Sequence, residues 1–98
     1  MDYDRHNIRE SERLNWQVYI LRCSDDSLYT GITTDMERRF RQHSAGSGAK
    51  YFRGRQPLAV VFREGGHNRS SASRREAEIK ALSRSEKDLL TQKKSEAP

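Results

Sequence analysis

Five side chains of this sequence have the chemistry that hydrolysis of a phosphodiester bond requires. They are Tyr19, Tyr29, Arg39, His43 and Glu76. Arg39 and His43 have the spacing of residues that share one face of a helix. A guanidinium there would offer a planar fork of donors to the negative charge that develops on the phosphate oxygens. A carboxylate such as Glu76 can hold Mg²⁺ or Mn²⁺ next to a phosphate. The set therefore predicts a metal-assisted phosphodiesterase site.

Each of these residues also has a purely structural interpretation. Arg39 lies among other arginines, which is typical of a solvated basic helix face. Glu76 closes a Ser73-Arg74-Arg75-Glu76 pattern that matches a capping box, and Glu78 is an equally available carboxylate. The two tyrosines fit the core of a sheet, since a phenol with a pKa of about 10 is a poor base at neutral pH. Spacing alone leaves the choice between Glu76 and Glu78 open.

A basic stretch follows the candidate helix and favours contact with nucleic acid. Residues 38–55 contain no acidic side chain. Positive charge follows the phosphate backbone, and aromatic rings stack on bases. The stretch carries no code for reading base edges, so we expect recognition of shape or backbone, with a merely solvated loop as the alternative. The predicted nucleic-acid contacts, with one lysine from a later helix, are Arg38, Arg41, Lys50, Tyr51, Arg53, Arg55 and Lys80.

The elements that must position these residues can be predicted from the sequence pattern. Trp16 to Cys23 is rich in β-branched and aromatic residues, and turn residues separate it from a second such run. Capping boxes at Thr34 and Ser83 and glycines at 46 and 48 mark helix ends. We predict strands at 16–23, 27–33 and 58–62, and helices at 35–45, 70–82 and 83–90. The fold class is then α+β, a small three-stranded, mainly antiparallel sheet flanked by helices in the order β-β-α-β-α-α.

Length and composition restrict the class of protein. The 98 residues suffice for one domain, which we place at 15–90 between flexible tails at 1–14 and 91–98. A net charge of +5 favours an anionic partner, most commonly nucleic acid. Cys23 is the only cysteine, which excludes an intramolecular disulfide. No stretch is long and apolar enough for a membrane helix or a signal peptide, so we expect a cytoplasmic protein that does not bind membranes.

Taken together, these residues resemble the GIY-YIG nuclease family over residues 16–83. Gln17-Val18-Tyr19 matches the first half of the family motif, with Gln17 in place of its first glycine. Tyr29-Thr30-Gly31 matches the second half, with Thr30 in an apolar position. Arg39, His43 and Glu76 occupy the family's helical positions. The segments Gly48-Ala49-Lys50-Tyr51 and Arg53-Gly54-Arg55 are similar to those of the small stand-alone bacterial members.

The resemblance implies a role for each site residue and selects Glu76 over Glu78. Tyr29 would be the general base, Tyr19 would orient the nucleophile or phosphate, and Arg39 would stabilise the developing charge. His43 would assist proton transfer, and Glu76 would hold one divalent ion, Mg²⁺ or Mn²⁺. The implied function is a metal-dependent endonuclease acting on DNA, with structure-specific cleavage or repair as the expected use. The alternative is a module that binds nucleic acid through a weak or inactive site and is targeted by a protein partner.

Overall fold

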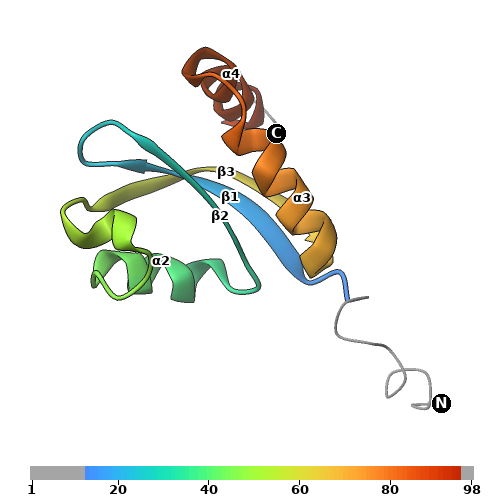
Figure 1. Cartoon of the computed structure of the whole chain (residues 1–98), viewed down its shortest axis with the longest axis horizontal. Coiled ribbons are helices and arrows are strands. Elements are labelled where there is room, and N and C mark those ends of the chain that lie inside the picture. The colour runs from blue at the N-terminus through green and yellow to red at the C-terminus, as the bar shows by residue number, and fades with distance from the viewer. Residues whose placement is uncertain (1–12, 96–98) are drawn as a thin grey trace.

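The computed structural model describes residues 13–95 and confirms the predicted order of elements (Figure 1). Residues 1–12, which hold most of the predicted N-terminal tail, lie outside the described part. The strands are β1 (Trp16–Cys23), β2 (Leu28–Thr33) and β3 (Pro57–His67). The helices are α2 (Met36–Ser44), α3 (Arg69–Lys80) and α4 (Arg84–Ser95), with a 3₁₀ turn, η2 (Lys50–Arg53), before β3. The predicted fold class, α+β with an antiparallel three-stranded sheet, is therefore correct.

The first strand is the centre of the sheet. The strand order is β2-β1-β3, and both pairs are antiparallel. In the register of these pairs, Tyr19 lies opposite Gly31 on β2 and Arg63 on β3. Because side chains alternate along a strand, Val18 and Ile20 face one side of the sheet while Tyr19 and Leu21 face the other. All four are fully buried, so β1 is covered on both faces.

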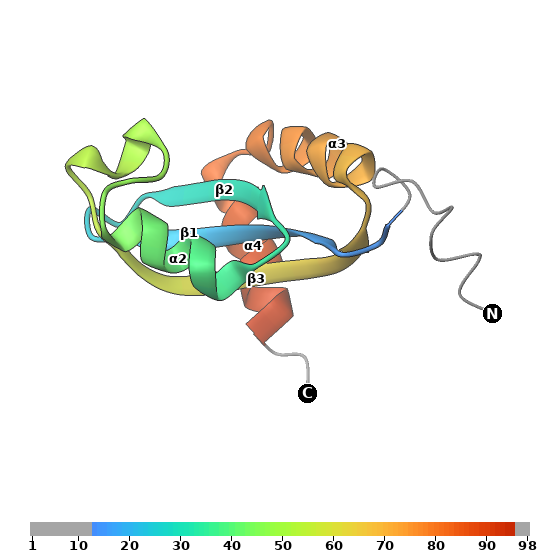
Figure 2. The same cartoon turned by 90° about the horizontal axis from the view of Figure 1, so that it is seen from below.

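Helices cover the two faces of the sheet with two separate cores. One core contains Val18 and Ile20 with Ala72 and Ile79 of α3, and Leu90 of α4 packs against it. The other core contains Tyr19, Leu21 and Cys23 with Met36 of α2 and Phe52 of η2. Figures 1 and 2 show α2 on one side of the strands and α3 and α4 on the other. None of the helices within residues 13–95 is long and apolar enough to cross a membrane.

The third strand is longer than the sequence pattern predicts. We predicted a strand at 58–62, but β3 continues to His67, which pairs with Trp16. Gly66 has a φ of 76°, which a glycine adopts without strain. Trp16 pairs with His67 and Val18 pairs with Glu64, so the register shifts between these two pairs. Gly65 and Gly66 therefore form a bulge within the strand.

The helix boundaries differ from the predicted ones by one to five residues. Asp35, not Thr34, is the N-cap of α2, and its side chain accepts a hydrogen bond from the backbone N–H of Arg38. Asn68 caps α3, so the predicted start near residue 70 was late. The capping box at Ser83 is confirmed, with the Ser83 N–H donating to Glu86. Helix α4 then continues to Ser95, beyond the predicted end at residue 90, through residues of good helix propensity.

Candidate active site

The Tyr19 ring can take its position only because the residue opposite it, Gly31, has no side chain. The Tyr19 side chain is completely buried, although it carries a polar hydroxyl group. A Cβ atom built on Gly31, the cross-strand partner, would overlap the phenol oxygen and Cζ of Tyr19. The Tyr19 ring therefore lies across β2 at a place that only glycine leaves open. The Tyr19 side chain thus approaches the backbone of β2 closely at Gly31.

The Tyr19 hydroxyl forms a buried hydrogen bond with His43 of α2. The phenol oxygen lies 2.9 Å from Nε2 of the imidazole, and His43 is as fully buried as Tyr19. Burial, reinforced by the nearby positive charge of Arg39, lowers the pKa of His43 to about 4. A Cβ atom on Gly48 would lie 2.5 Å from Nδ1 of His43, so this glycine lets the following loop close over the ring. The imidazole is therefore neutral at pH 7 and shielded from solvent.

Charges around Tyr19 show which other side chains lie near it. Burial raises the pKa of Tyr19 to about 12, and a hydrogen bond from Arg39 partly opposes that rise. The negative charge of Glu76 on α3 contributes to the increase, as does Tyr29. The Tyr19 phenol is therefore protonated at neutral pH. Groups on β2, α2 and α3 thus act on the Tyr19 hydroxyl of β1, through charge or through a hydrogen bond.

Tyr29 is more accessible to solvent than Tyr19 and His43. It is half-buried on β2, and its ring centroid lies 5.3 Å from that of His43 in an edge-on arrangement. Its ring centroid lies 6.3 Å from that of Tyr19, 4.9 Å from that of Phe52 and 5.1 Å from that of Tyr51. Partial exposure leaves the Tyr29 hydroxyl within reach of a ligand, whereas that of Tyr19 is enclosed.

The structure distinguishes Glu76 from Glu78, which their spacing in the sequence could not do. Glu78 is 66% exposed and pairs with Arg75, away from the tyrosines. Glu76 is 24% exposed, influences Tyr19 and forms an ion pair with Lys80 at 3.1 Å. The Ser73-to-Glu76 pattern is not a cap, because α3 begins at Arg69.

The donor set around Glu76 agrees with one hard divalent ion. Within residues 13–95 there is no group of three or more His, Cys, Asp or Glu side chains that would enclose a metal. Mg²⁺ usually keeps several waters and binds through one or two carboxylates together with substrate phosphate. A single, partly exposed carboxylate whose charge acts on the Tyr19 phenol fits that mode of binding. It does not fit a closed protein cage.

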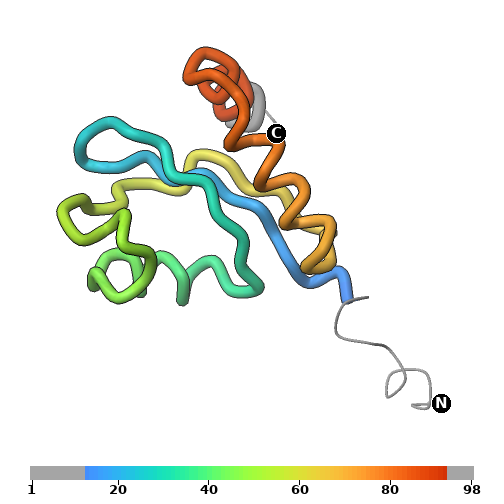
Figure 3. Tube along the Cα trace, viewed as in Figure 1, coloured from blue at the N-terminus to red at the C-terminus, as the bar shows by residue number. Residues whose placement is uncertain are grey.

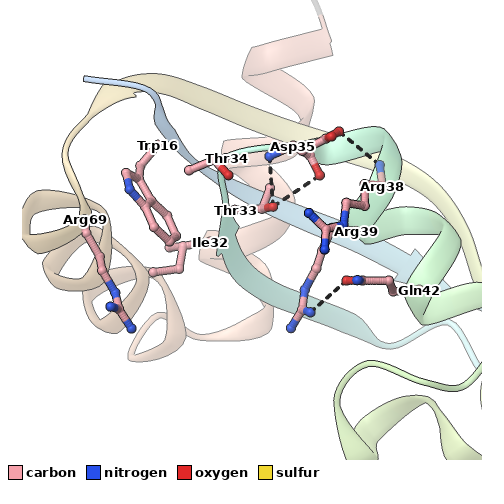
Figure 4. A pocket seen from close by; sticks show the side chains of 9 residues that line it. All are labelled: Trp16, Ile32, Thr33, Thr34, Asp35, Arg38, Arg39, Gln42 and Arg69. Atoms are coloured by element: carbon pink, nitrogen blue, oxygen red, sulfur yellow. Dashed lines mark hydrogen bonds between the residues drawn. The ribbon is translucent and has the colours of Figure 1, made fainter. Parts of the chain in front are cut away.

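Arg39 forms one wall of a pocket between α2 and the start of α3 (Figure 4). Its Nη1 donates to the side chain of Gln42 at 3.0 Å, while its buried Nε has no partner among the described residues. The pocket has a volume of about 380 Å³, and Trp16, Ile32 and Arg69 line its other side. Sequence reasoning missed Trp16 and Arg69, because no spacing rule connects them with α2. Only the packing of α3 beside β2 brings them together.

Two of the predicted nucleic-acid contacts instead fasten the loop at residues 45–56 to the β1–β2 turn. The Tyr51 hydroxyl donates to Ser27 at 2.5 Å, and Arg55 donates to Asp25 at 2.6 Å while it stacks on Tyr51 at 4.1 Å. Figure 3 shows this loop passing beside the turn. Hydrogen bonds from Ser27 and from the Arg55 guanidinium lower the pKa of Asp25 to about 2. Any contact between Arg55 and a nucleic acid would compete with this ion pair.

The remaining residues that we predicted to contact nucleic acid are more exposed to solvent. Arg38 and Arg41 are exposed on α2, and Lys50 and Arg53 are exposed on the loop. Among the described residues, none of these four forms an ion pair with a carboxylate. Lys80 is exposed but engaged by Glu76. Their contact with nucleic acid stays a prediction.

Comparison with known proteins identifies close relatives of this arrangement. The model of the GIY-YIG catalytic domain matches residues 15–89. A UPF0213 protein of Haloquadratum walsbyi is 56% identical over 75 residues, which cover 76% of this chain and 84% of the relative. The UPF0213 protein YhbQ of Escherichia coli is 47% identical over 75 residues, covering 76% of this chain and 75% of YhbQ.

Two solved structures are also similar. The solution NMR structure of the UPF0213 protein BH0048 from Bacillus halodurans aligns with a TM-score of 0.52 and 47% identity, covering 81% of this chain and 84% of that chain. The solution NMR structure of the protein EF2693 from E. faecalis aligns with a TM-score of 0.56 and 35% identity, covering 84% and 88%.

Proposed function

The chain belongs to the GIY-YIG catalytic domain family, and we propose that it is a metal-dependent endonuclease that hydrolyses phosphodiester bonds in DNA. The observation that carries this proposal is the convergence on Tyr19. His43 is hydrogen-bonded to its hydroxyl, and both Arg39 and Glu76 are close enough to act on its charge. Four elements of the fold contribute to a cluster with this donor chemistry, which supports a site for an anionic reacting group.

The two tyrosines have different environments and so take different roles. Tyr19 is buried, and its raised pKa keeps the phenol protonated, so it serves as a hydrogen-bonding group that orients the phosphate or the nucleophile. Tyr29 is half-buried and can meet the nucleophile directly. We assign to Tyr29 the general-base step, in which its phenolate form, after losing the phenol proton to solvent, would accept the proton of the attacking water.

Arg39 and His43 complete the electrostatic environment. Arg39 places guanidinium donors beside Tyr19 and at the edge of an open pocket, where they stabilise the charge that grows on the phosphate oxygens. His43 is fully buried, so it acts through Tyr19 rather than by contact with the substrate. Its neutral ring fixes the orientation of the phenol. His43 is thus a positioning residue in this proposal.

Glu76 would hold the divalent ion, whose chemistry there is charge neutralisation on the phosphate. The carboxylate forms an ion pair with Lys80, and its negative charge acts on Tyr19, so it is an oxygen ligand placed near the proposed reacting group. A single carboxylate favours a one-ion arrangement over a two-ion arrangement, which requires shared carboxylate ligands.

The proposal is tested by cleavage of labelled duplex, single-stranded, nicked, flapped and four-way DNA in Mg²⁺ and Mn²⁺. The wild-type chain is compared with Glu76→Ala and Tyr29→Phe, and Glu78→Ala is the matched control on the same helix. We expect metal-dependent cutting that is lost in the first two variants and kept in Glu78→Ala. Cutting that persists in Glu76→Ala would contradict the assigned metal ligand. A folded wild-type chain that binds DNA in EDTA but never cuts would favour the binding module.

A further inference from the structure

The pocket beside Arg39 has the charge of an anion-binding site. Three arginines line it, Arg38 and Arg39 from α2 and Arg69 from the first turn of α3, against a single carboxylate, Asp35. One oxygen of Asp35 is already engaged as the cap of α2. Figure 4 shows the guanidinium groups of Arg38 and Arg39 on one side of the pocket and that of Arg69 on the other. Charged donors therefore flank the cavity from two helices.

Unsatisfied donors supply a second, independent observation at the same place. Three buried side-chain nitrogens in the described part of the chain have no hydrogen-bond partner: Trp16 Nε1, Arg39 Nε and His43 Nδ1. Two of the three belong to residues that line this pocket, and both are obligate N–H donors. Buried donors without acceptors are rare in folded proteins and call for an explanation. Both nitrogen atoms are enclosed in the wall, so their N–H groups add positive potential to the pocket without contacting a ligand directly.

The other wall of the pocket is aromatic and apolar. Trp16 and Ile32 form it, and the Arg69 guanidinium lies over the Trp16 ring at 5.7 Å from the centroid. An indole ring with an arginine beside it is a surface on which a nucleobase stacks without regard to sequence. The volume of about 380 Å³ lies within the range of small-ligand pockets. Phosphate donors and a stacking surface thus meet in one cavity.

We propose that this pocket is a nucleotide subsite next to the cleaved bond, in which Arg38 and Arg69 hold a phosphate of the DNA strand and Trp16 stacks on its base. The inference rests on the proposed nuclease function, because Arg39 is shared between the pocket and the cluster around Tyr19. A base can reach Trp16 only when it is not stacked within a duplex. The subsite therefore selects an unpaired nucleotide, as found in single strands, flaps and junctions.

Binding to this subsite can be followed without any cleavage. Trp16 is the only tryptophan of the chain, so emission under tryptophan-selective excitation reports on this pocket. A single-stranded thymidine oligonucleotide, added to the wild-type chain in EDTA, should change Trp16 emission and shield it from iodide. An abasic strand of the same length, whose binding is measured by anisotropy, should leave the emission nearly unchanged. Saturating thymidine oligonucleotide that leaves Trp16 emission unaltered would overturn the proposal.

Arg69 is tested against an arginine on the same helix that lies outside the pocket. Arg74 is exposed, and its guanidinium donates a hydrogen bond to the Ser70 hydroxyl one turn earlier. Arg69→Ala should weaken binding of the oligonucleotide roughly tenfold and reduce the salt slope by about 0.7. Arg74→Ala should change the affinity less than about threefold. Equal losses in both variants would mean a general effect of charge and would refute the subsite.

The subsite and the nuclease function fail in distinguishable ways. In cleavage of single-stranded or flapped DNA, Arg69→Ala should raise KM about tenfold with little change in kcat, since a binding contact away from the reacting atoms is lost. An unchanged KM would refute the subsite and leave the nuclease proposal standing. A wild-type chain that never cuts, but binds single strands in a manner that depends on Arg69, would refute the nuclease proposal and keep the subsite.

Discussion

The phenol oxygen of Tyr19 and Nε2 of His43 lie 2.9 Å apart in a fully buried place. A hydrogen bond between two neutral groups thereby joins strand β1 to helix α2, which packs against one face of the sheet. The two pKa values, raised to about 12 for Tyr19 and lowered to about 4 for His43, keep both partners uncharged across the physiological range. The pair therefore provides a fixed geometry, and its protonation state does not switch near pH 7.

Stability should fall on mild acidification because of His43. Its pKa is about 4 in the folded protein and about 6.5 when unfolded. Between these values the unfolded chain binds the extra proton, so stability is complete above pH 6.5 and declines as the pH falls toward 4. The expected loss between pH 7.5 and pH 5 is about 2 kcal/mol, measured by chemical denaturation. His43→Asn should remove this component, whereas His67→Asn should retain it. A decline of equal size in all three proteins would exclude His43 as its source.

Gly31→Ala should disable the site through Tyr19. The new methyl group would overlap the phenol, so the Tyr19 ring must leave its position or β2 must shift. Overpacking of this kind costs about 1–3 kcal/mol of stability, and a displacement near 1 Å costs about a hundredfold in rate. Denaturation and cleavage assays measure the two effects. Gly65→Ala is the control, since its Cβ meets nothing within 4 Å. Wild-type cleavage by Gly31→Ala would disprove the need for this contact.

Lys80→Met should strengthen the binding of a divalent ion. The Lys80 ammonium lies 3.1 Å from Glu76 and competes with a metal for that carboxylate. A partly exposed ion pair is worth at most about 1 kcal/mol, so the dissociation constant for Mn²⁺ should fall by up to about fivefold. Electron paramagnetic resonance of Mn²⁺ without DNA measures it. Lys87→Met, which removes a lysine from α4, should leave the constant unchanged. Weaker binding in Lys80→Met would speak against Glu76 as the ligand.

Arg55→Ala should loosen the loop at residues 45–56. Arg55 joins Asp25 and the Tyr51 ring, and so fastens the loop to the β1–β2 turn. Amide hydrogen exchange in the loop should become faster, and limited proteolysis should cut there sooner. Arg53→Ala removes a neighbouring exposed arginine and should have neither effect. Unchanged exchange in Arg55→Ala would mean that the Tyr51–Ser27 hydrogen bond suffices to hold the loop.

The order of strands and helices could be predicted because each element has its own local signal. The β-branched run before Cys23 and the turn residues after it specify a hairpin whatever surrounds it. Helix starts were less certain where several capping residues stand in a row, as at Thr33, Thr34 and Asp35, since any of them can accept the first bond. The Gly65-Gly66 pair has the composition of a turn. Only pairing with β1 makes it a bulge.

The five site residues could be named from motifs, but their environments could not. Burial of His43 depends on Gly48 and on the path of the loop over it, which are tertiary features. The choice between Glu76 and Glu78 follows from the rotation of α3, whose charged residues give no clear apolar face. Trp16 and Arg69 face Arg39 only because α3 packs beside β2. Their roles in catalysis and binding stay predictions.

The order of the elements along the chain has a consequence for protein synthesis. Tyr19, Tyr29, Arg39 and His43 all precede β3, while Glu76 comes from α3, which follows it. A nascent chain that has released the hairpin and α2 from the ribosome therefore still lacks the carboxylate. If Glu76 is the metal ligand, the growing polypeptide has no complete site for hydrolysis before α3 has left the ribosome. Its hydrolytic capacity would appear only when α3 emerges and docks.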